Sequence, residues 1–464
     1  MKLPGFIDGH LHVLGVGYFQ TIVDLSNAQS IEEVINILKS KKDDKIIIGR
    51  GWNQDQFAEN RLITKTDLNQ VSTTIPIVVT RVCGHVLVAN DKMLSMAGIT
   101  ETTSQVLGGS FDFSTGLFSE KAMSLIHNKM PALTKKDIRN FLKLANDTLI
   151  KNGITSVASD DFSSFNVDYE MVIETIKEMY EENEIQVKIT QQVNLPYKTL
   201  KDFLEKGYAN KVIHPKFKMG PLKILADGSL GGRTAAMIEP YSDDPSNYGI
   251  KTFTDEELFE LMSLADQYGM DSVVHAIGDA TSLQVIQILK KVIDQSKRKN
   301  HHHAIIHAQL TPKNQIEMME ELNIGAIVQP IFMNTDIKII ESRLGDRIDD
   351  IYLYKTMYEK INLGFSTDAP IEPVNPFYNI YTAMTNRSIK YPFLDSFNPK
   401  ECFTLQESLK AYTVNNLPYV YEDTLKDDDY IIIDRDLNPN DPESIRDALV
   451  VKTVIDGEEV FSLK

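Results

Sequence analysis

Cysteine is nearly absent from this 464-residue sequence. The two cysteines, Cys83 and Cys402, are too few for a disulfide framework, and neither lies in the C-x-x-C spacing of a zinc site. A disulfide-stabilised secreted domain is therefore excluded. So little cysteine favours a reducing compartment, and we expect a cytoplasmic protein.

Long apolar runs and a surplus of basic residues are missing as well. No stretch approaches the roughly 20 apolar residues of a membrane-spanning helix, and the N-terminus lacks the basic and apolar segments of a signal peptide. Lys and Arg number 48 against 65 Asp and Glu, a formal net charge of −17. This acidity argues against a nucleic-acid partner and against docking on an anionic membrane.

The remaining composition is that of a globular protein, with 42% hydrophobic and 24% charged residues. Short apolar runs alternate with amphipathic helical segments, one of which begins with the capping box Thr254-x-x-Glu257. This alternation predicts an α/β fold, a (β/α)8 barrel, with a doubly wound open sheet as the alternative. The eight expected strands are residues 4–12, 154–159, 186–193, 217–226, 270–275, 303–307, 324–329 and 361–366.

Two parts of the chain do not fit the repeating strand–helix unit. About 140 residues separate the first two expected strands, far more than one unit needs, and we interpret residues 45–130 as an inserted, lid-like segment over the barrel mouth. Residues 416–464 look like a small β appendage, with strands expected at 430–434, 448–455 and 459–461. The predicted domains are therefore a barrel over residues 1–415 and an appendage over 416–464.

Histidines and one carboxylate follow the expected strands. His10 and His12 are two apart at the end of the first strand, so both imidazoles can point into the barrel mouth. His275 and His307 close two later strands, and Asp368 follows another. Each alone has a simpler interpretation, as a surface or core histidine or as a helix cap. Together they form the ligand set that a catalytic Zn²⁺ or related ion prefers.

Lys223 lies among apolar residues of the fourth strand, where a charged ammonium is disfavoured. One interpretation pairs it with a carboxylate such as Asp227. The other is a lysine carboxylated by CO₂, whose anionic oxygens could bridge two metal ions.

Several of these residues lie in segments that resemble a known family. Residues 4–12, Pro-Gly-Phe-Ile-Asp-Gly-His-Leu-His, resemble the opening signature of the amidohydrolase superfamily. Other segments narrow the resemblance to the YtcJ-like group, also called the amidohydrolase 3 family: residues 49–52 (GRGW), 81–85 (RVCGH), 223–234, 275–279 (HAIGD), 307–310 (HAQL) and 366–370 (STDAP).

The resemblance implies a (β/α)8 barrel that holds one or two divalent ions, with zinc expected. His10, His12, His275 and His307 would bind metal, Asp368 would bind metal and shuttle protons, and carboxylated Lys223 would bridge if two ions are present. Metal-bound water loses its proton near neutral pH and can attack a carbonyl, while Asp368 relays the proton to the departing nitrogen.

Three further residues are candidates for substrate contacts. His85 lies in the inserted segment and could donate a hydrogen bond to a substrate carbonyl or oxyanion, although a structural role explains it equally well. Ser229 and Arg233 follow the fourth strand and could line the pocket, or simply form its loop. For the run His301-His302-His303 we expect only solvation or packing.

The N-terminus departs from the family pattern. Relatives carry an initial stretch whose strands join the C-terminal ones in a small β-sandwich, but here the chain begins almost at the first barrel strand. We therefore expect an incomplete sandwich in which residues 448–461 lack partners and leave an open edge. A truncated sequence, a reduced sandwich, or a second copy supplying strands in a homo-oligomer would each explain this.

The sequence thus predicts a metal-dependent amidohydrolase that acts on a small molecule, cleaving an amide or N-acyl C–N bond other than a peptide bond. Adenosine-type deaminases have a pattern like His-Ala-x-Glu after the fifth strand, in which the Glu is the proton donor. Position 278 here is Gly, so this proton donor is absent. The alternatives are an ester or lactone hydrolase using the same site, and a non-catalytic metal-binding barrel.

Overall fold

The computed structural model describes residues 1–41, 45–130, 133–163, 165 and 167–463. The chain forms two compact units, which are treated separately here. The barrel unit comprises Met1–Val16 and Lys135–Lys464, and the inserted unit comprises Gly17–Thr134. The predicted segment 45–130 lies within the inserted unit. Among the described residues, no helix combines the length and apolar character needed to cross a bilayer.

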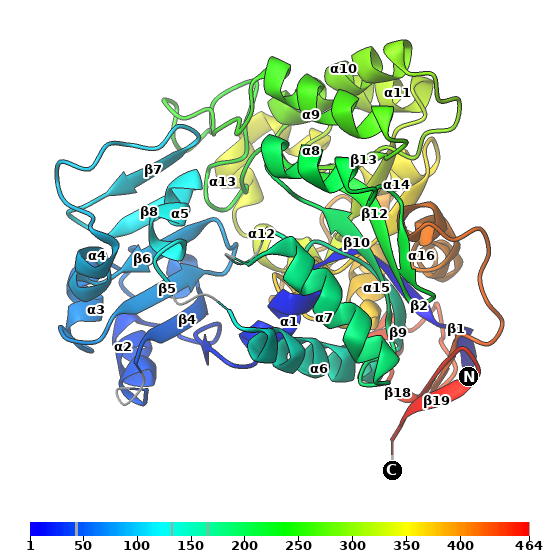
Figure 1. Ribbon diagram of the computed structural model, residues 1–464, viewed down its shortest axis with the longest axis horizontal. Helices are drawn as coiled ribbons and strands as arrows, with labels where there is room; N and C mark the ends of the chain where they lie inside the picture. Colours follow the sequence, from blue (N-terminus) through cyan, green and yellow to red (C-terminus); the bar gives the residue numbers. More distant parts are fainter. Residues whose placement is uncertain (42–44, 131–132, 164, 166, 464) are drawn as a thin grey trace. The chain divides into compact units, whose positions relative to one another are not determined.

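Eight parallel strands form the centre of the barrel unit (Figure 1). They pair in the order of the sequence, which excludes the doubly wound alternative because that fold reverses its strand order. The predicted (β/α)8 barrel is confirmed. Its strands are β2 (Phe6–Leu11), β9 (Ile154–Ser159), β10 (Lys188–Val193), β12 (Phe217–Leu225), β13 (Ser272–Ala276), β14 (Ala304–His307), β15 (Gly325–Val328) and β16 (Leu363–Phe365), with β11 (Val212–His214) added antiparallel to β12.

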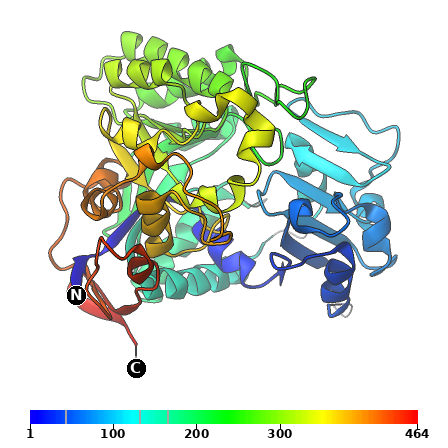
Figure 2. The same ribbon diagram turned by 180° about the vertical axis from the view of Figure 1, so that it is seen from behind.

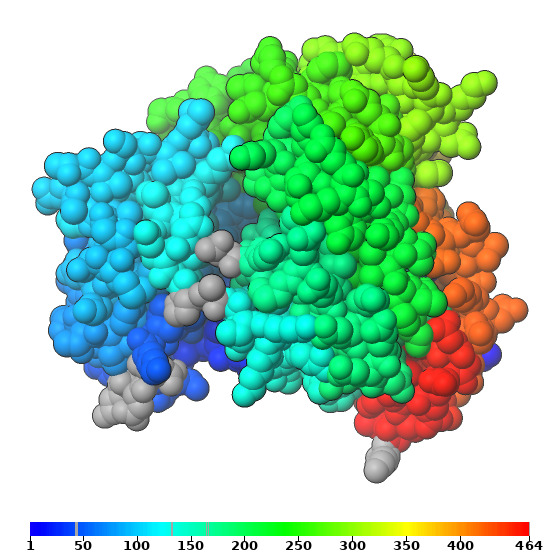
Figure 3. All heavy atoms as spheres, viewed as in Figure 1, coloured from blue at the N-terminus to red at the C-terminus, as the bar shows by residue number. Residues whose placement is uncertain are grey.

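Helices cover the outside of these strands (Figure 1), and in the space-filling view they form much of the visible surface of this unit (Figure 3). Helix α9 shows why such segments are helical. Thr254 and Glu257 form the predicted capping box, and the buried residues that follow recur at helical spacing. The larger helices of this unit are α6 (Lys135–Lys151), α7 (Tyr169–Glu181), α8 (Tyr197–Glu205), α9 (Asp255–Gln267), α10 (Asp279–Gln295), α11 (Lys313–Glu321), α14 (Tyr354–Tyr358), α15 (Pro376–Thr385) and α16 (Leu405–Ala411).

The barrel closes between β16 and β2. The Asp368 N–H donates to the His10 carbonyl at 3.0 Å, and the His12 N–H donates to the Ala369 carbonyl at 2.9 Å. We call this junction between β16 and β2 the seam. Further along it, the Asn416 side-chain amide donates to the carbonyls of Ile7 and Phe365, both at 2.7 Å. A single buried side chain therefore bridges the two strands.

Glycine is required where Asn416 enters the barrel wall. A Cβ on Gly364 would lie 1.8 Å from the Asn416 Oδ1, and a Cβ on Gly9 would lie 2.6 Å from the same atom. Both distances are far below van der Waals contact, so a side chain at either glycine would displace the bridging amide.

A small antiparallel sheet contains both ends of the described chain (Figure 2). Its order is β1 (Lys2–Pro4), β17 (Tyr430–Ile433), β18 (Val450–Ile455) and β19 (Glu458–Ser462). The expectation that residues 448–461 lack partners is wrong, because β18 pairs on both sides. The expected first strand, 4–12, corresponds to β2 except for Pro4, which belongs to the separate strand β1 that pairs with β17.

The inserted unit is a mixed sheet with its own apolar core. Trp52 is fully buried there, where its indole N–H donates to the Val79 carbonyl at 3.2 Å. The strands run in the order β3 (Val23–Asp24), β4 (Ile47–Trp52), β5 (Ile77–Arg81), β6 (Val86–Ala89), β8 (Leu117–Glu120) and β7 (Gly109–Asp112), and the helices include α2 (Ile31–Lys39), α3 (Lys65–Asn69), α4 (Asp91–Ala97) and α5 (Ser124–His127).

From the contacts of Asn416 we predict that one isosteric substitution in the seam strongly lowers the free energy of unfolding. Asn416→Asp replaces the bridging NH₂ with an oxygen, so two buried carbonyls lose their donor and face a carboxylate. We expect the free energy of unfolding to fall by about 3 kcal/mol or more, measured by urea denaturation. The neighbouring Asn415→Asp removes one half-buried hydrogen bond, to the Leu363 carbonyl, and should cost under about 1 kcal/mol. Equal losses in the two variants would contradict the role of Asn416.

Candidate metal centre

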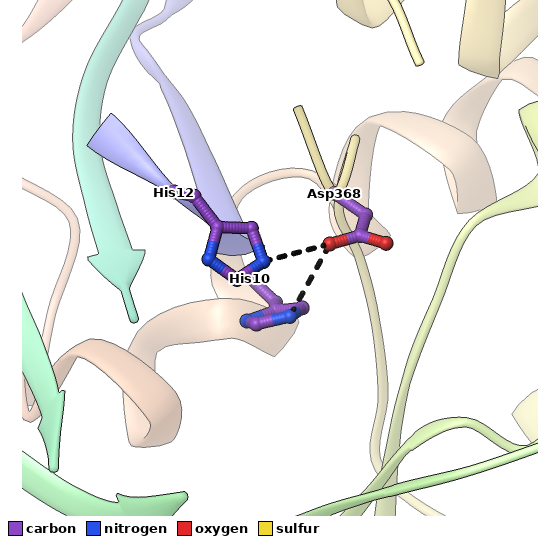
Figure 4. Close-up of side chains that lie close together, drawn as sticks. All are labelled: His10, His12 and Asp368. Carbon is purple, nitrogen blue, oxygen red and sulfur yellow. Dashed lines mark ion pairs between the residues drawn. The ribbon is translucent and has the colours of Figure 1, made fainter. Parts of the chain in front are cut away.

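Two histidines and one carboxylate converge at the carboxyl end of the barrel strands (Figure 4). His10 ends β2, His12 follows it, and Asp368 follows β16 across the seam. The Asp368 Oδ1 lies 3.4 Å from the His10 Nε2 and 3.3 Å from the His12 Nε2. Asp368 has a left-handed backbone, φ 54°, a conformation uncommon for a side-chain-bearing residue and frequent at functional sites.

The tautomers of both imidazoles follow from their other hydrogen bonds. The His12 Nδ1 lies 2.7 Å from the backbone carbonyl of Asp160, and the His10 Nδ1 lies 2.7 Å from the Gln192 Oε1. Because these oxygens only accept, each Nδ1 carries a proton, and in the neutral ring the lone pair lies on Nε2. Two lone pairs and a carboxylate oxygen are thus close together, which fits a divalent metal ion.

The charge states suit such an ion. Burial, reinforced by Lys223, holds the pKa of His10 well below its usual value, so the ring is neutral. Burial alone would raise the pKa of Asp368, but the hydrogen bond from His12 and the other imidazoles outweigh it and the pKa is lowered. The pKa of His12 is raised because the Asp368 carboxylate outweighs burial, so without metal its Nε2 can carry a proton and donate to Asp368. A bound metal would displace that proton. An ionised carboxylate beside imidazoles is the state in which metal binds.

His275 and His307 lie at the same end of the barrel. Their ring centroids are 4.4 Å apart, and the His307 ring is 6.3 Å from that of His10. The His307 Nδ1 lies 2.6 Å from the Gln329 Oε1. The His275 Nε2 lies 3.0 Å from the Gly228 carbonyl, which leaves the lone pair of the neutral ring on Nδ1. The structure therefore places His307 between His275 and His10, while the tightest donor group of this site holds His10, His12 and Asp368.

Lys223 is buried in the wall beside these residues, 2% exposed. Its Nζ lies 3.9 Å from the Asp160 Oδ2, and burial lowers its pKa. The carboxylate that pairs with Lys223 is therefore Asp160 and not the suggested Asp227. The Asp227 carboxylate instead accepts three backbone hydrogen bonds, which tie the loops after β12 and β13 together, from Ala236, Ile277 and Gly278.

Ser229 and Arg233 occupy a loop that is braced internally. Arg233 pairs with Asp243, with its Nη2 2.9 Å from the Oδ2. The Ser229 Oγ accepts the Gly232 N–H at 3.2 Å, and the Ser229 N–H donates to the Thr234 Oγ1 at 2.9 Å. These contacts account for the positions of both residues, and a contact with substrate stays a prediction for each.

His85 belongs to the inserted unit, between β5 and β6. Its Nδ1 lies 3.0 Å from the Glu120 Oε2, and its side chain is 16% exposed. This ion pair orients the imidazole within its own unit. The predicted role of His85 toward substrate stays a prediction.

Four polar residues of the site escaped the sequence analysis. Gln192 and Gln329 bond to ligand histidines, Asn416 bridges the seam, and the Asp8 carboxylate accepts the Thr367 N–H at 3.0 Å. Burial raises the pKa of Asp8 to about 7. For Gln192 and Gln329 the available signal was their position at the ends of expected strands, but an amide is not a ligand type that draws attention. Asp8 lies in the middle of the expected first strand, and Asn416 lies outside the expected barrel strands.

The chain belongs to a known family of enzymes. Its fold and site are those of a parallel barrel with a histidine–carboxylate centre at the carboxyl end of the strands. The sequence profile of the amidohydrolase family matches residues 1–461, and the protein is a member of that family.

Individual relatives agree with this assignment. The putative amidohydrolase YtcJ of Bacillus subtilis (strain 168) is 31% identical, covering 99% of this chain and 89% of the relative. The protein LONG AFTER FAR-RED 3 of Arabidopsis thaliana is 26% identical over 89% of this chain and 73% of its own. A crystal structure of an uncharacterized metal-dependent hydrolase from Pyrococcus horikoshii OT3 matches with a TM-score of 0.75 and 29% identity, over 94% of this chain and 86% of that one.

In the His301–His303 run, two of the histidines are at least partly buried, and ligand atoms of His301, His303 and Asp266 lie within 4.8 Å of one another. His302 is exposed, while His303 is 1% exposed and accepts the Ser272 N–H at its Nδ1. Burial lowers the pKa of His303 to about 4. The unfolded chain binds this proton below about pH 6.5 and the folded chain only near pH 4, so acid destabilises the fold through this residue.

The His303 environment predicts a pH effect on stability. Between pH 7.5 and 5 this residue alone should cost the folded state about 2 kcal/mol. His303→Gln keeps an acceptor for the Ser272 N–H. In this variant the free energy of unfolding, measured by urea denaturation, should fall less between pH 7.5 and 5, by that same amount. His302→Gln serves as the control and should behave as the parent does. An unchanged pH dependence in His303→Gln would refute the assignment.

Proposed function

We propose that this protein is a divalent-metal-dependent hydrolase that cleaves an amide or N-acyl C–N bond of a small molecule, with zinc as the expected ion. The observation that carries the proposal is the convergence of His10, His12 and Asp368, with both Nε2 atoms beside the carboxylate. The Pyrococcus horikoshii structure, described as a metal-dependent hydrolase, supports it.

The donor set fits a metal centre of one or two ions. His10, His12 and Asp368 would hold one ion, His275 and His307 would complete the site, and a carboxylated Lys223 would bridge two ions. Once bound, the metal would act as a Lewis acid that polarises the scissile carbonyl and lowers the pKa of water to near neutrality.

Asp368 is the residue to which we assign proton transfer. Its Oδ1 faces the two imidazoles, so we assign the proton to Oδ2. Because its pKa is low, the carboxylate is ionised and can accept a proton from the attacking water. The same group then protonates the departing nitrogen, which makes the leaving group a neutral amine.

Position 278 favours this assignment over a deaminase. Gly278 directly precedes α10, and a Cβ there would lie 1.9 Å from the Ala236 carbonyl oxygen. A glutamate cannot stand at this position without rearranging the loop. Asp368 is therefore the proton donor in the proposed reaction.

Substrate selection is assigned to the loops. Ser229, Arg233 and His85 are proposed substrate contacts, with His85 as a hydrogen-bond donor to the carbonyl or oxyanion, and residues 45–130 are the proposed lid. An ester or lactone would be attacked at the same site, so the substrate class has to be found by experiment.

The central test combines metal analysis, a substrate screen and one variant. Protein with stoichiometric metal should hydrolyse N-acyl amines faster than matched esters, and Asp368→Asn should lower kcat by at least about 100-fold. The surface variant Asp434→Asn should leave kcat unchanged. Metal-loaded protein that turns over neither class would favour a non-catalytic barrel, and preferred turnover of esters would favour the alternative hydrolase.

The state of Lys223 has a separate test. A buried amine whose nearest described carboxylate is 3.9 Å away can react with CO₂. Protein loaded with metal in ¹³C-bicarbonate should show one carbamate resonance by ¹³C NMR, absent from Lys223→Met and retained in Lys218→Met. If no carbamate resonance appears and one metal binds per chain, the bridged two-metal site is wrong.

A further inference from the structure

Two fully buried glutamines contact ligand histidines from opposite sides of the barrel. Gln192 lies in β10 and Gln329 directly follows β15, and both are 0% exposed. The Gln192 Oε1 is 2.7 Å from the His10 Nδ1, and the Gln329 Oε1 is 2.6 Å from the His307 Nδ1. These are among the shortest hydrogen bonds that either ring makes.

The orientation of each amide follows from its remaining partners. The Gln329 Nε2 donates to the Ile327 carbonyl at 3.3 Å and to the Ser366 Oγ at 2.6 Å. The Gln192 Nε2 donates to the Gly9 carbonyl at 3.3 Å. A carbonyl oxygen accepts and cannot donate, so a flipped amide would place two oxygens against each other. Each Oε1 must therefore face its histidine, and each histidine must donate from Nδ1.

We propose that Gln192 and Gln329 are positioning residues that hold the Nδ1 of His10 and of His307 as the hydrogen-bond donor, which leaves Nε2 as the nitrogen available to metal. This inference rests on the proposed function. In many metal sites a carboxylate takes this place and raises the basicity of the histidine. The amides here fix the same tautomer without adding another charge to a wall that already holds buried Asp8, Asp160 and Asp368.

Gln329 also connects His307 to the strand that carries Asp368. The Ser366 hydroxyl that receives its Nε2 hydrogen bond lies two residues before Asp368. The Phe332 ring stacks on His307 with centroids 5.4 Å apart. The Gln329 amide thus fixes the direction in which the His307 Nδ1 points, and the stacked Phe332 ring restricts rotation of the imidazole plane.

The tautomer is tested on metal-free protein. Selective ¹⁵N-histidine labelling and NMR at pH 7.5, with resonances assigned by His10→Asn and His307→Asn, should show Nδ1 protonated and Nε2 unprotonated in both rings. A proton on Nε2 of either ring would overturn the proposal. This measurement needs no metal and no substrate, so it stands even if the proposed function fails.

Metal affinity is the second measurement, by competition with a chromogenic chelator. Gln329→Leu should weaken Zn²⁺ binding about 10- to 100-fold, whereas Gln329→Glu, which keeps the acceptor, should bind at least as tightly as the parent. Gln315→Leu removes a buried glutamine that donates to the Asp279 carbonyl and makes no hydrogen bond to a histidine among the described residues, and this variant should bind Zn²⁺ normally. Parental affinity in a folded Gln329→Leu protein, or equal losses in all three variants, would overturn the proposal.

Discussion

The closure of the barrel between its first and last strands is the constraint on which the site depends. His10 and His12 come from one side of this seam and Asp368 from the other, more than 350 residues later in the sequence. Backbone hydrogen bonds join these same residues directly, so the seam and the metal centre are one structure. Asn416 holds the seam below them, and Gly9 and Gly364 give it the space to do so.

Electrostatic balance is the second constraint. Burial removes charge from His10 and His307, whose pKa values fall well below the usual value, while Asp368 stays ionised because imidazoles surround it. Lys223 sits in the same wall with its pKa lowered by burial. Neutral donors around one anionic carboxylate suit a divalent cation, since the cation then supplies the compensating charge.

Much of the fold and of the candidate site could be predicted from the sequence, because each barrel strand is a short apolar run that can be recognised locally. The eight apolar runs predicted the eight strands. The residue types and the strand-end positions predicted a group of metal ligands: His10, His12, His275, His307 and Asp368. Gln192, Gln329 and Asn416 were not, because an amide contributes to a site only through its partners. The division of residues 4–12 into two strands was missed for a similar reason: β1 exists by pairing with β17, more than 400 residues away.

By itself, the sequence determined the order of strands and helices and the residue types at the strand ends, since both depend on short-range periodicity and on side-chain chemistry. Only the tertiary structure decided which nitrogen of each imidazole is available to a metal. That choice is made by single oxygen atoms of Gln192, Gln329 and Asp160, which the fold brings within hydrogen-bonding distance from distant strands. Hydrogen bonds act over about 3 Å, so their pattern is decided only when the barrel has closed.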